Sequence, residues 1–175
     1  MDYLCSMFSD RTRTVSFTGH RTYCGEADAA LAETLRQLYA EGYRVFISGM
    51  AVGFDLAAAE AVLALREAYP EVRLVCAVPF EGQERRFPAA EKVRYGRVRE
   101  RADASVVVCG GYRPDCYARR NDYLADRASV LVAWYDGSAG GTRYTVRRAL
   151  RTGREVRNLH PSACEAAHPG QGTLF

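Results

Sequence analysis

The stretch "SGMAVGFDLAAAE", residues 48–60, marks the passage from a buried strand to a helix and indicates the class of fold. An apolar run precedes it, and within it and just beyond, Leu56, Ala59 and Leu63 recur at the spacing of one helix face. It also holds two glycines and then Asp55, which is more than an ordinary strand-to-helix turn needs. Asp55 therefore either caps the helix or contacts a ligand.

The same passage from strand to helix repeats along the chain. Valine-rich runs without strict polar alternation are typical of strands that are covered on both faces. These runs are residues 14–19, 43–48, 72–78, 104–110 and 129–135, with a short sixth at 154–159. Helical patterns lie between them, so the sequence predicts an α/β fold: one domain in a three-layer sandwich with a mostly parallel sheet of five or six strands.

Length and composition limit the kind of protein. The chain has 175 residues, of which 48% are hydrophobic and 26% charged, values that suit one globular domain. No apolar run reaches the roughly 18 residues of a membrane span, and nothing in the first residues resembles an export signal, so a cytoplasmic protein is expected. We divide the chain into an N-terminal arm (1–12), the domain (13–159) and a C-terminal tail (160–175).

Neither the cysteines nor the charge suggests a metal or a nucleic acid. The six cysteines form no C-x-x-C pair and have no histidine at zinc-ligand spacing, so no metal site is expected. Cys76 and Cys109 are predicted to be buried and Cys24 to lie in a loop. The net charge is only +3, and the arginines of residues 143–151 at spacing four are more typical of a solvated helix face than of a nucleic-acid site. The sequence leaves a homo-oligomer open.

In open parallel sheets, ligands bind beyond the carboxyl ends of the strands, near the point where the strand order reverses. In "SGMAVGFD", Ser48 and Gly49 end the strand, and Gly53 would let backbone approach a bound group at a helix start whose free amides attract phosphate. The alternative is a glycine-assisted turn with Asp55 near the positive helix end. The spacing matches neither the dinucleotide G-x-G-x-x-G motif nor a P-loop.

A second glycine corner follows the fifth run, in "YDGSAGGTRYT". Gly140 and Gly141 with Thr142 would form a backbone nest and a hydroxyl suited to phosphate oxygens, or simply a loop with Thr142 as the helix cap. Two such corners at one sheet edge together predict a diphosphate or nucleotide ligand.

Two further segments add polar side chains at this edge. In "TGHR", Arg21 can pair with phosphate or carboxylate, and His20 can bind a ribose, transfer protons or be an ordinary loop residue. Arg120 and Asn121 enter a helix, and an asparagine on its inward face needs a partner, either the ligand or another loop.

In this order the motifs resemble those of YpsA-type members of the SLOG superfamily, the Rossmann-like group that includes DNA-processing protein A and the LOG phosphoribohydrolases. The resemblance runs from about residue 14 to 159. Its carriers are "TGHR", "SGMAVGFDLAAAE", "VPF", "ARRNDYLADRASVLVAWYDG" and "GGTRYTVRRA".

The resemblance implies a pocket for a nucleotide-derived ligand, ADP-ribose or an NAD-related molecule, and no other cofactor. By this resemblance Gly49, Gly53 and Asp55 line one side of the pocket, Gly140, Gly141 and Thr142 hold a phosphate on the other, and Arg21, Arg120 and Asn121 lie nearby. The full set of predicted binding residues also includes Gly19, His20, Ser48, Asp136 and Tyr144.

The chain departs from the LOG enzymes at one motif. Their Pro-Gly-Gly-x-Gly-Thr-x-x-Glu stretch ends in a glutamate that takes part in cleaving an N-glycosidic bond, whereas Thr142 is followed here by Arg143, Tyr144 and Thr145. LOG-type hydrolysis is therefore not expected.

Three functions stay open. The first interpretation is a small bacterial sensor or regulatory protein that binds a nucleotide. The alternatives are a nucleotide-processing hydrolase that uses Asp55, Asp136 or His20 as acid or base, and a binder of single-stranded nucleic acid.

Overall fold

The computed structural model describes residues 10–162, in which strands and helices alternate as the sequence predicts. The strands are β1 (Thr14–Gly19), β2 (Val45–Ser48), β3 (Arg73–Val78), β4 (Ala104–Val107), β5 (Val130–Trp134) and β6 (Glu155–Asn158). The helices are α2 (Asp28–Ala40), α3 (Phe54–Ala68), α4 (Ala89–Arg101), α5 (Cys116–Arg127) and α6 (Gly141–Arg151), with short 3-10 turns η1 (Arg11–Arg13) and η2 (Gln83–Arg86).

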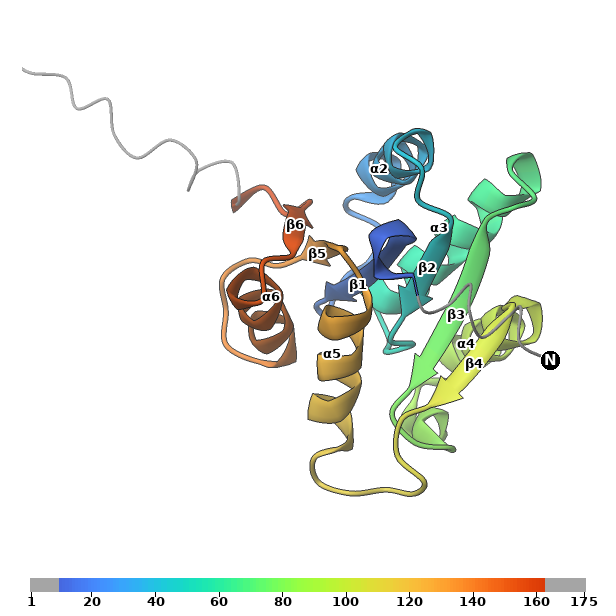
Figure 1. The fold of residues 1–175 in the computed structure, drawn as a ribbon. Helices are drawn as coiled ribbons and strands as arrows, with labels where there is room; N and C mark the ends of the chain where they lie inside the picture. The colour runs from blue at the N-terminus through green and yellow to red at the C-terminus, as the bar shows by residue number, and fades with distance from the viewer. Residues whose placement is uncertain (1–9, 163–175) are drawn as a thin grey trace, which may run out of the picture.

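The six strands form one sheet in the order β4-β3-β2-β1-β5-β6, and every neighbouring pair is parallel. This confirms the predicted single-domain, Rossmann-like α/β class. The chain builds the sheet outward from β1 to β4 and then crosses back to place β5 and β6 on the other side of β1 (Figure 1). The strand order therefore reverses between β1 and β5.

Helices cover both faces of the sheet, which makes the three layers (Figure 1). On one face α2, α3 and α4 pack on the largest core cluster, where Phe17 of β1 and Phe46 of β2 stack with ring centroids 6.3 Å apart. On the other face Leu124 of α5 packs on β2 and β3, and Val146 of α6 packs on β5. Burial of these apolar side chains is the main force that holds the layers together.

β4 differs from the prediction for residues 104–110. The strand ends at Val107, and Ser105 and Val107 are exposed, so the expectation that every run is covered on both faces is wrong here. The reason is its place at the sheet edge: Ser105 and Val107 pair with Cys76 and Val78 on the face of α3 and α4, where the buried cluster ends at β3. On the other face, Ala104 and Val106 of the same strand pack with Leu124 of α5. Two ladder-like hydrogen bonds continue past its end, from Val108 N to Val78 O at 2.8 Å and from Cys109 N to Pro79 O at 3.0 Å.

The predicted arm and tail are only partly visible. Of the predicted arm, Asp10 caps η1 and residues 11 and 12 belong to it, and residues 160–162 of the predicted tail follow β6. Residues 1–9 and 163–175, with Cys5, Cys164 and His168, lie outside the described residues. Cys76 and Cys109 are buried and Cys24 is exposed, as predicted. No helix within residues 10–162 is long and apolar enough to cross a bilayer.

Gly53 is a position where backbone geometry demands glycine. Its φ is +83°, and a Cβ there would lie 2.6 Å from the carbonyl oxygens of His20 and Arg21. Gly153 has a similar φ of +72° but has nothing within 4 Å of the same position.

We expect Gly153→Ala to lower the free energy of unfolding by about 1–2 kcal/mol, the cost of a left-handed residue with a side chain. Gly53→Ala should cost at least about 2 kcal/mol more, because the β1–α2 loop must also move. Urea unfolding of both variants measures the difference. Equal losses would show that the β1–α2 loop yields without cost.

Candidate functional site

A pocket of about 400 Å³ opens at the carboxyl edge of the sheet where the strand order reverses between β1 and β5. This volume lies within the usual range for small-molecule sites. Its lining comes from the end of β1 and the loop after it, from the first turns of α3 and α6, and from the first two turns of α5. The lining residues are Thr18, His20, Arg21, Asp55, Tyr117, Arg120, Asn121, Gly141 and Thr142.

Asp55 lies in the first turn of α3, and only 4% of it is exposed. Its Oδ2 atom lies 3.6 Å from Nη1 of Arg120 and accepts a long hydrogen bond of 3.5 Å from the backbone N–H of Ala51. Burial raises the pKa of Asp55 to about 6, and the nearby charge of Arg120 only partly offsets that rise. The carboxylate thus holds a buried cation and the preceding loop while it also faces the pocket.

Arg120 is the centre of a polar network behind the pocket. Its guanidinium donates to the carbonyl of Gly49 through Nη1 and to Oδ1 of Asn121 through Nε, the latter at 2.9 Å. The side-chain amide of Asn121 donates in turn to the carbonyl of Gly141 at 3.4 Å. Asn121, which needed a partner on sequence grounds, therefore links α5 to the start of α6. Burial lowers the pKa of Arg120 from its ordinary value.

His20 pairs with Asp136 at the edge of the pocket. Its Nε2 atom lies 2.8 Å from Oδ1 of Asp136, and the backbone N–H of Ser138 donates to the same Oδ1 at 2.9 Å. Hydrogen bonds from Ser138, and then His20, lower the pKa of Asp136 to about 2. The pair forms a loop-to-loop contact between β1 and β5 and places an imidazole on the pocket wall.

The two glycine corners turn out to differ. At the start of α3, the N–H groups of Phe54 and Leu56 already donate to the carbonyls of His20 and Ala51, at 3.3 and 3.2 Å. At the start of α6, no acceptor within residues 10–162 is found for the N–H groups of Gly141 and Thr142. Two amides of the α3 corner are therefore occupied, whereas the amides of Gly141 and Thr142 have no acceptor among the described residues and belong to residues that line the pocket.

The structure brings half of the fourteen predicted binding residues together. Those that line the pocket are His20, Arg21, Asp55, Arg120, Asn121, Gly141 and Thr142. Asp136 joins them through His20.

The other predicted residues lie outside the pocket. Ser48 supports Asp55 from behind, because its hydroxyl donates to the carbonyl of Asp55 at 2.8 Å. Gly49 binds Arg120 through its carbonyl, and Gly19 packs against Phe54.

Gly53 lines a different hollow, and Gly140 and Tyr144 lie on the outer face of α6. The approach that Gly53 permits is to the backbone of the β1–α2 loop, since its Cβ position meets the carbonyls of His20 and Arg21.

Sequence reasoning missed Thr18 and Tyr117 as lining residues. Thr18 is the buried fifth residue of β1, and Tyr117 sits in the first turn of α5. A signal was present for Tyr117, because Arg120 and Asn121 follow it at helical spacing and so share its face.

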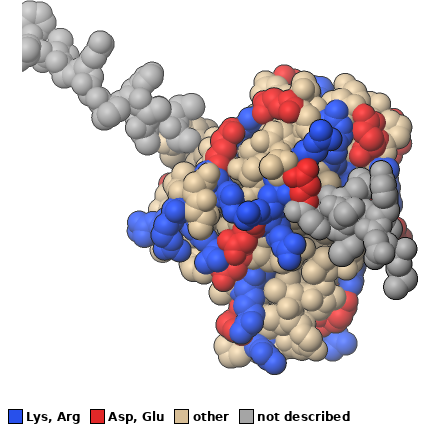
Figure 2. Space-filling view, viewed as in Figure 1, with Lys and Arg blue, Asp and Glu red and all other residues tan. Residues whose placement is uncertain are grey.

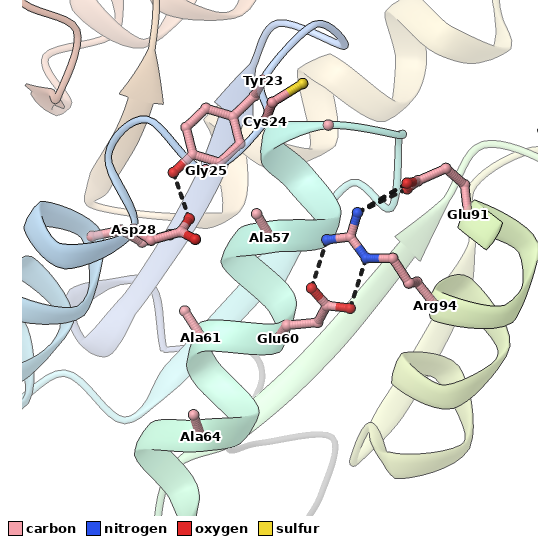
Figure 3. A pocket seen from close by; sticks show the side chains of 12 residues that line it. Tyr23, Cys24, Gly25, Asp28, Ala57, Glu60, Ala61, Ala64, Glu91 and Arg94 are labelled. Carbon is pink, nitrogen blue, oxygen red and sulfur yellow. Dashed lines mark hydrogen bonds and ion pairs between the residues drawn. The ribbon is translucent and has the colours of Figure 1, made fainter. Parts of the chain in front are cut away.

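The second hollow, which Gly53 lines, has a volume of about 470 Å³ and is bordered by α3 and by residues of α2 and α4. Figure 3 shows the small side chains of Ala57, Ala61 and Ala64 along α3 and the charged groups beside them. Arg94 donates to Glu60 at 2.9 and 2.6 Å and to Glu91 at 3.0 Å (Figure 3). These charges satisfy one another, so the hollow presents no free binding group of the kind found at the start of α6.

Arginines gather on the outer face of α6, where Figure 2 shows basic side chains at the left of the view. They border a groove of about 340 Å³. Arg148 is engaged by Asp122 and Asp126 at 3.2 and 2.7 Å, and Tyr144 donates to Asp122 at 2.6 Å. The groove residues are Gly140, Arg143, Tyr144, Arg147, Arg148 and Arg151.

No group of three or more His, Cys, Asp or Glu side chains is placed to hold a metal ion in the part of the chain that the structure describes.

A protein-family model described as the YspA SLOG family, with the short name YpsA, matches residues 16–160. The chain belongs to this YpsA SLOG family. The matched segment contains every residue that lines the pocket.

Curated relatives are bacterial. The chain is 33% identical to the uncharacterized SPbeta prophage-derived protein YoqJ of Bacillus subtilis over 130 residues, which are 66% of this chain and 76% of YoqJ. It is 34% identical to a UPF0398 protein of Shouchella clausii over 113 residues, which are 62% of this chain and 59% of that protein.

Solved structures share the fold. DNA processing protein A (DprA) from Streptococcus pneumoniae superposes with a TM-score of 0.59 and 22% identity over 83% of this chain, which spans about half (49%) of DprA. DprA from Helicobacter pylori, a single-stranded-DNA-binding protein, gives a TM-score of 0.62 and 17% identity over 86% of this chain and 66% of DprA.

The raised pKa of Asp55 predicts a pH dependence of stability. The folded-state value of about 6 lies above the ordinary 3.8, so the folded protein holds this proton more tightly than the unfolded chain. The resulting stabilisation is fully present below the unfolded-state pKa and is lost as the pH rises through the folded-state pKa. Asparagine does not titrate. The free energy of unfolding of the wild type minus that of Asp55→Asn should therefore fall between about pH 4 and pH 7.

Urea unfolding of both proteins across this range measures that difference. Asp115→Asn is the control, because the hydrogen bond from Arg119 holds the pKa of Asp115 below its ordinary value and an arginine does not titrate in this range, so its difference from wild type should stay constant above about pH 5. A constant or rising difference for Asp55→Asn would contradict the prediction.

Proposed function

We propose that this protein binds a nucleotide-derived ligand that carries a diphosphate, such as ADP-ribose or an NAD-related molecule, and acts as a sensor or regulatory protein. One observation carries the proposal: the amides at the start of α6 have no acceptor among the described residues and open into the same pocket as Arg21, Arg120 and Thr142. Free amides at a helix start, together with arginines, are a typical environment for phosphate.

The charges in the pocket favour an anion. Asp55 partly balances Arg120, but no salt bridge joins Arg21 to another residue within 10–162. The positive end of the α6 dipole adds to this charge. A phosphate bound at Gly141 and Thr142 would gain hydrogen bonds from the helix and attraction from both arginines.

The pocket also has groups suited to a ribose. The carboxylate of Asp55 can accept hydrogen bonds from sugar hydroxyls, and His20 lies on the same wall. Nucleotide chemistry on this fold is consistent with H. pylori DprA, which binds single-stranded DNA. Membership of the SLOG family supports the same class of ligand.

Isothermal titration with ADP-ribose tests the proposal, with Thr142→Val as the diagnostic variant. This change keeps the size of the side chain and removes the hydroxyl, so we expect the affinity to fall about tenfold or more, as for the loss of a hydrogen bond to a charged group. Thr152→Val, at the other end of α6, is the matched control and should bind as the wild type does, since the Thr152 hydroxyl bonds to its own helix.

Two results would count against the proposal. If the wild type binds no ADP-ribose, NAD or nucleoside phosphate, the pocket is not a nucleotide site. If the wild type binds but Thr142→Val binds equally well, the phosphate lies elsewhere.

A hydrolase is the alternative, and the pairing of His20 with Asp136 is the observation that favours it, because it resembles an acid–base pair. Chromatography of the same protein–ligand mixture after incubation separates the two functions. Unchanged ligand supports a sensor, whereas released base, ribose phosphate or phosphate shows an enzyme.

The groove on α6 favours a second candidate, the binding of single-stranded nucleic acid. Arg143, Arg147 and Arg151 make no ion pair with another described residue and follow one another at about 6 Å along the helix axis. On this hypothesis a labelled oligonucleotide binds at physiological salt, and the double variant Arg147→Ala/Arg151→Ala weakens binding and reduces its salt dependence by about two ionic contacts. If the double variant binds the oligonucleotide as tightly as the wild type does, this candidate is rejected.

A further inference from the structure

We infer that the base of the nucleotide stacks on an aromatic shelf formed by Phe80, Tyr112 and Tyr117, which continues the pocket outward along the carboxyl edge of the sheet. The inference rests on the proposed function and names the part of the ligand that the pocket itself leaves unassigned.

The shelf is continuous with the pocket through Tyr117. This ring lines the pocket, and the guanidinium of Arg21 lies 5.7 Å from its centroid. Phe80 meets Tyr117 edge to face at 5.8 Å and meets Tyr112 in the same way at 5.2 Å. The three rings therefore form a row that begins at the pocket wall and ends at the surface, where 63% of Tyr112 is exposed.

The backbone explains why the rings meet. The hydrogen bond from Cys109 N to Pro79 O, at 3.0 Å, prolongs the pairing of β3 with β4 and sets Phe80 beside the loop that carries Tyr112. This loop forms the connection from β4 to α5 at the bottom of Figure 1.

The buried thiol of Cys116 holds the loop between β4 and α5 in place through two hydrogen bonds. Cys116 accepts a hydrogen bond from the N–H of Arg113 at 3.0 Å, and its own S–H donates to the carbonyl of Gly111 at 3.3 Å. The backbone on each side of Tyr112 is thus bound to the protein interior. The side chain of Tyr112 is left on the outer side, against Phe80.

This arrangement suits a flat aromatic group that follows a phosphate and a sugar. Nucleobases stack on aromatic side chains whatever their identity, because every base has a π-face, and a nearby arginine adds a cation–π attraction. The ligand class is therefore a nucleoside diphosphate derivative with any planar base. Tyr144, the other exposed tyrosine near this edge, is unsuitable because it lies in the α6 groove and is bonded to Asp122.

The test compares ADP-ribose, which has a base, with ribose 5-phosphate, which has none, by isothermal titration of wild type and Tyr112→Ala. We expect Tyr112→Ala to weaken ADP-ribose binding about tenfold or more and to change ribose 5-phosphate binding less than about twofold. Tyr112→Phe should restore the affinity for ADP-ribose, because stacking needs the ring and not the hydroxyl.

Tyr69→Ala is the matched control. Tyr69 stacks on Tyr39 at 4.0 Å, and this pair involves the last residues of α2 and the residue after α3, away from the pocket lining. Its loss should leave both affinities unchanged. Melting temperatures of all variants confirm that they fold.

The outcomes separate the two proposals. If the wild type binds neither ligand, and no NAD or nucleoside phosphate either, the proposed function fails and the shelf fails with it. If the wild type and Tyr112→Ala bind ADP-ribose with equal affinity, the shelf is not the base site. The same holds if Tyr112→Ala weakens the binding of ribose 5-phosphate as much as that of ADP-ribose. In both cases the proposed function stands.

Discussion

The buried guanidinium of Arg120 determines the shape of the carboxyl edge, because a charge this deep in a protein must be matched by charge and hydrogen bonds. Its partners come from separate parts of the chain: the carbonyl of Gly49 after β2, the carboxylate of Asp55 on α3 and the amide oxygen of Asn121 on α5. Removing any one of them would leave a buried donor or charge unsatisfied, which is costly. A side chain at Gly49 would also collide, since its Cβ would lie 2.7 Å from Oδ2 of Asp55.

The strand order turns this network into the back wall of a pocket. Because β5 lies beside β1, the loops after both strands meet at one point, and α6 begins there. Asn121 carries the network on to Gly141, so the free amides of α6 are positioned by the same contacts that satisfy Arg120. The stability of the edge and the geometry of the phosphate corner therefore share one set of hydrogen bonds.

The sequence was sufficient for the strands, the helices and the edge that carries the site, since these follow from hydrophobic periodicity and from the general behaviour of parallel sheets. It could not rank the two glycine corners, which look alike as sequence. The amide of Phe54 at the start of α3 is occupied by the carbonyl of His20, which lies far away along the chain, and only the fold brings the two together. Tyr117 was missed for a related reason: an aromatic residue at helical spacing with Leu124 has the pattern of a core residue, and which side of the helix start faces a cavity depends on tertiary packing.

The residues of the pocket fall into two groups that differ in how much bonding capacity they have left. Arg120 and Asn121 are buried and engaged by protein atoms, so they form a rigid wall that a ligand does not have to order. Arg21 and Thr142 line the same cavity and keep donors for which the described residues supply no acceptor. Because this wall is ordered before the ligand binds, the entropic cost of association is lower. The unpaired donors of Arg21 and Thr142 then make the pocket selective for an anionic ligand. On this reasoning the affinity for phosphate depends on Arg21 and Thr142. The network around Arg120 holds the start of α6 in the position from which Thr142 can bind the phosphate.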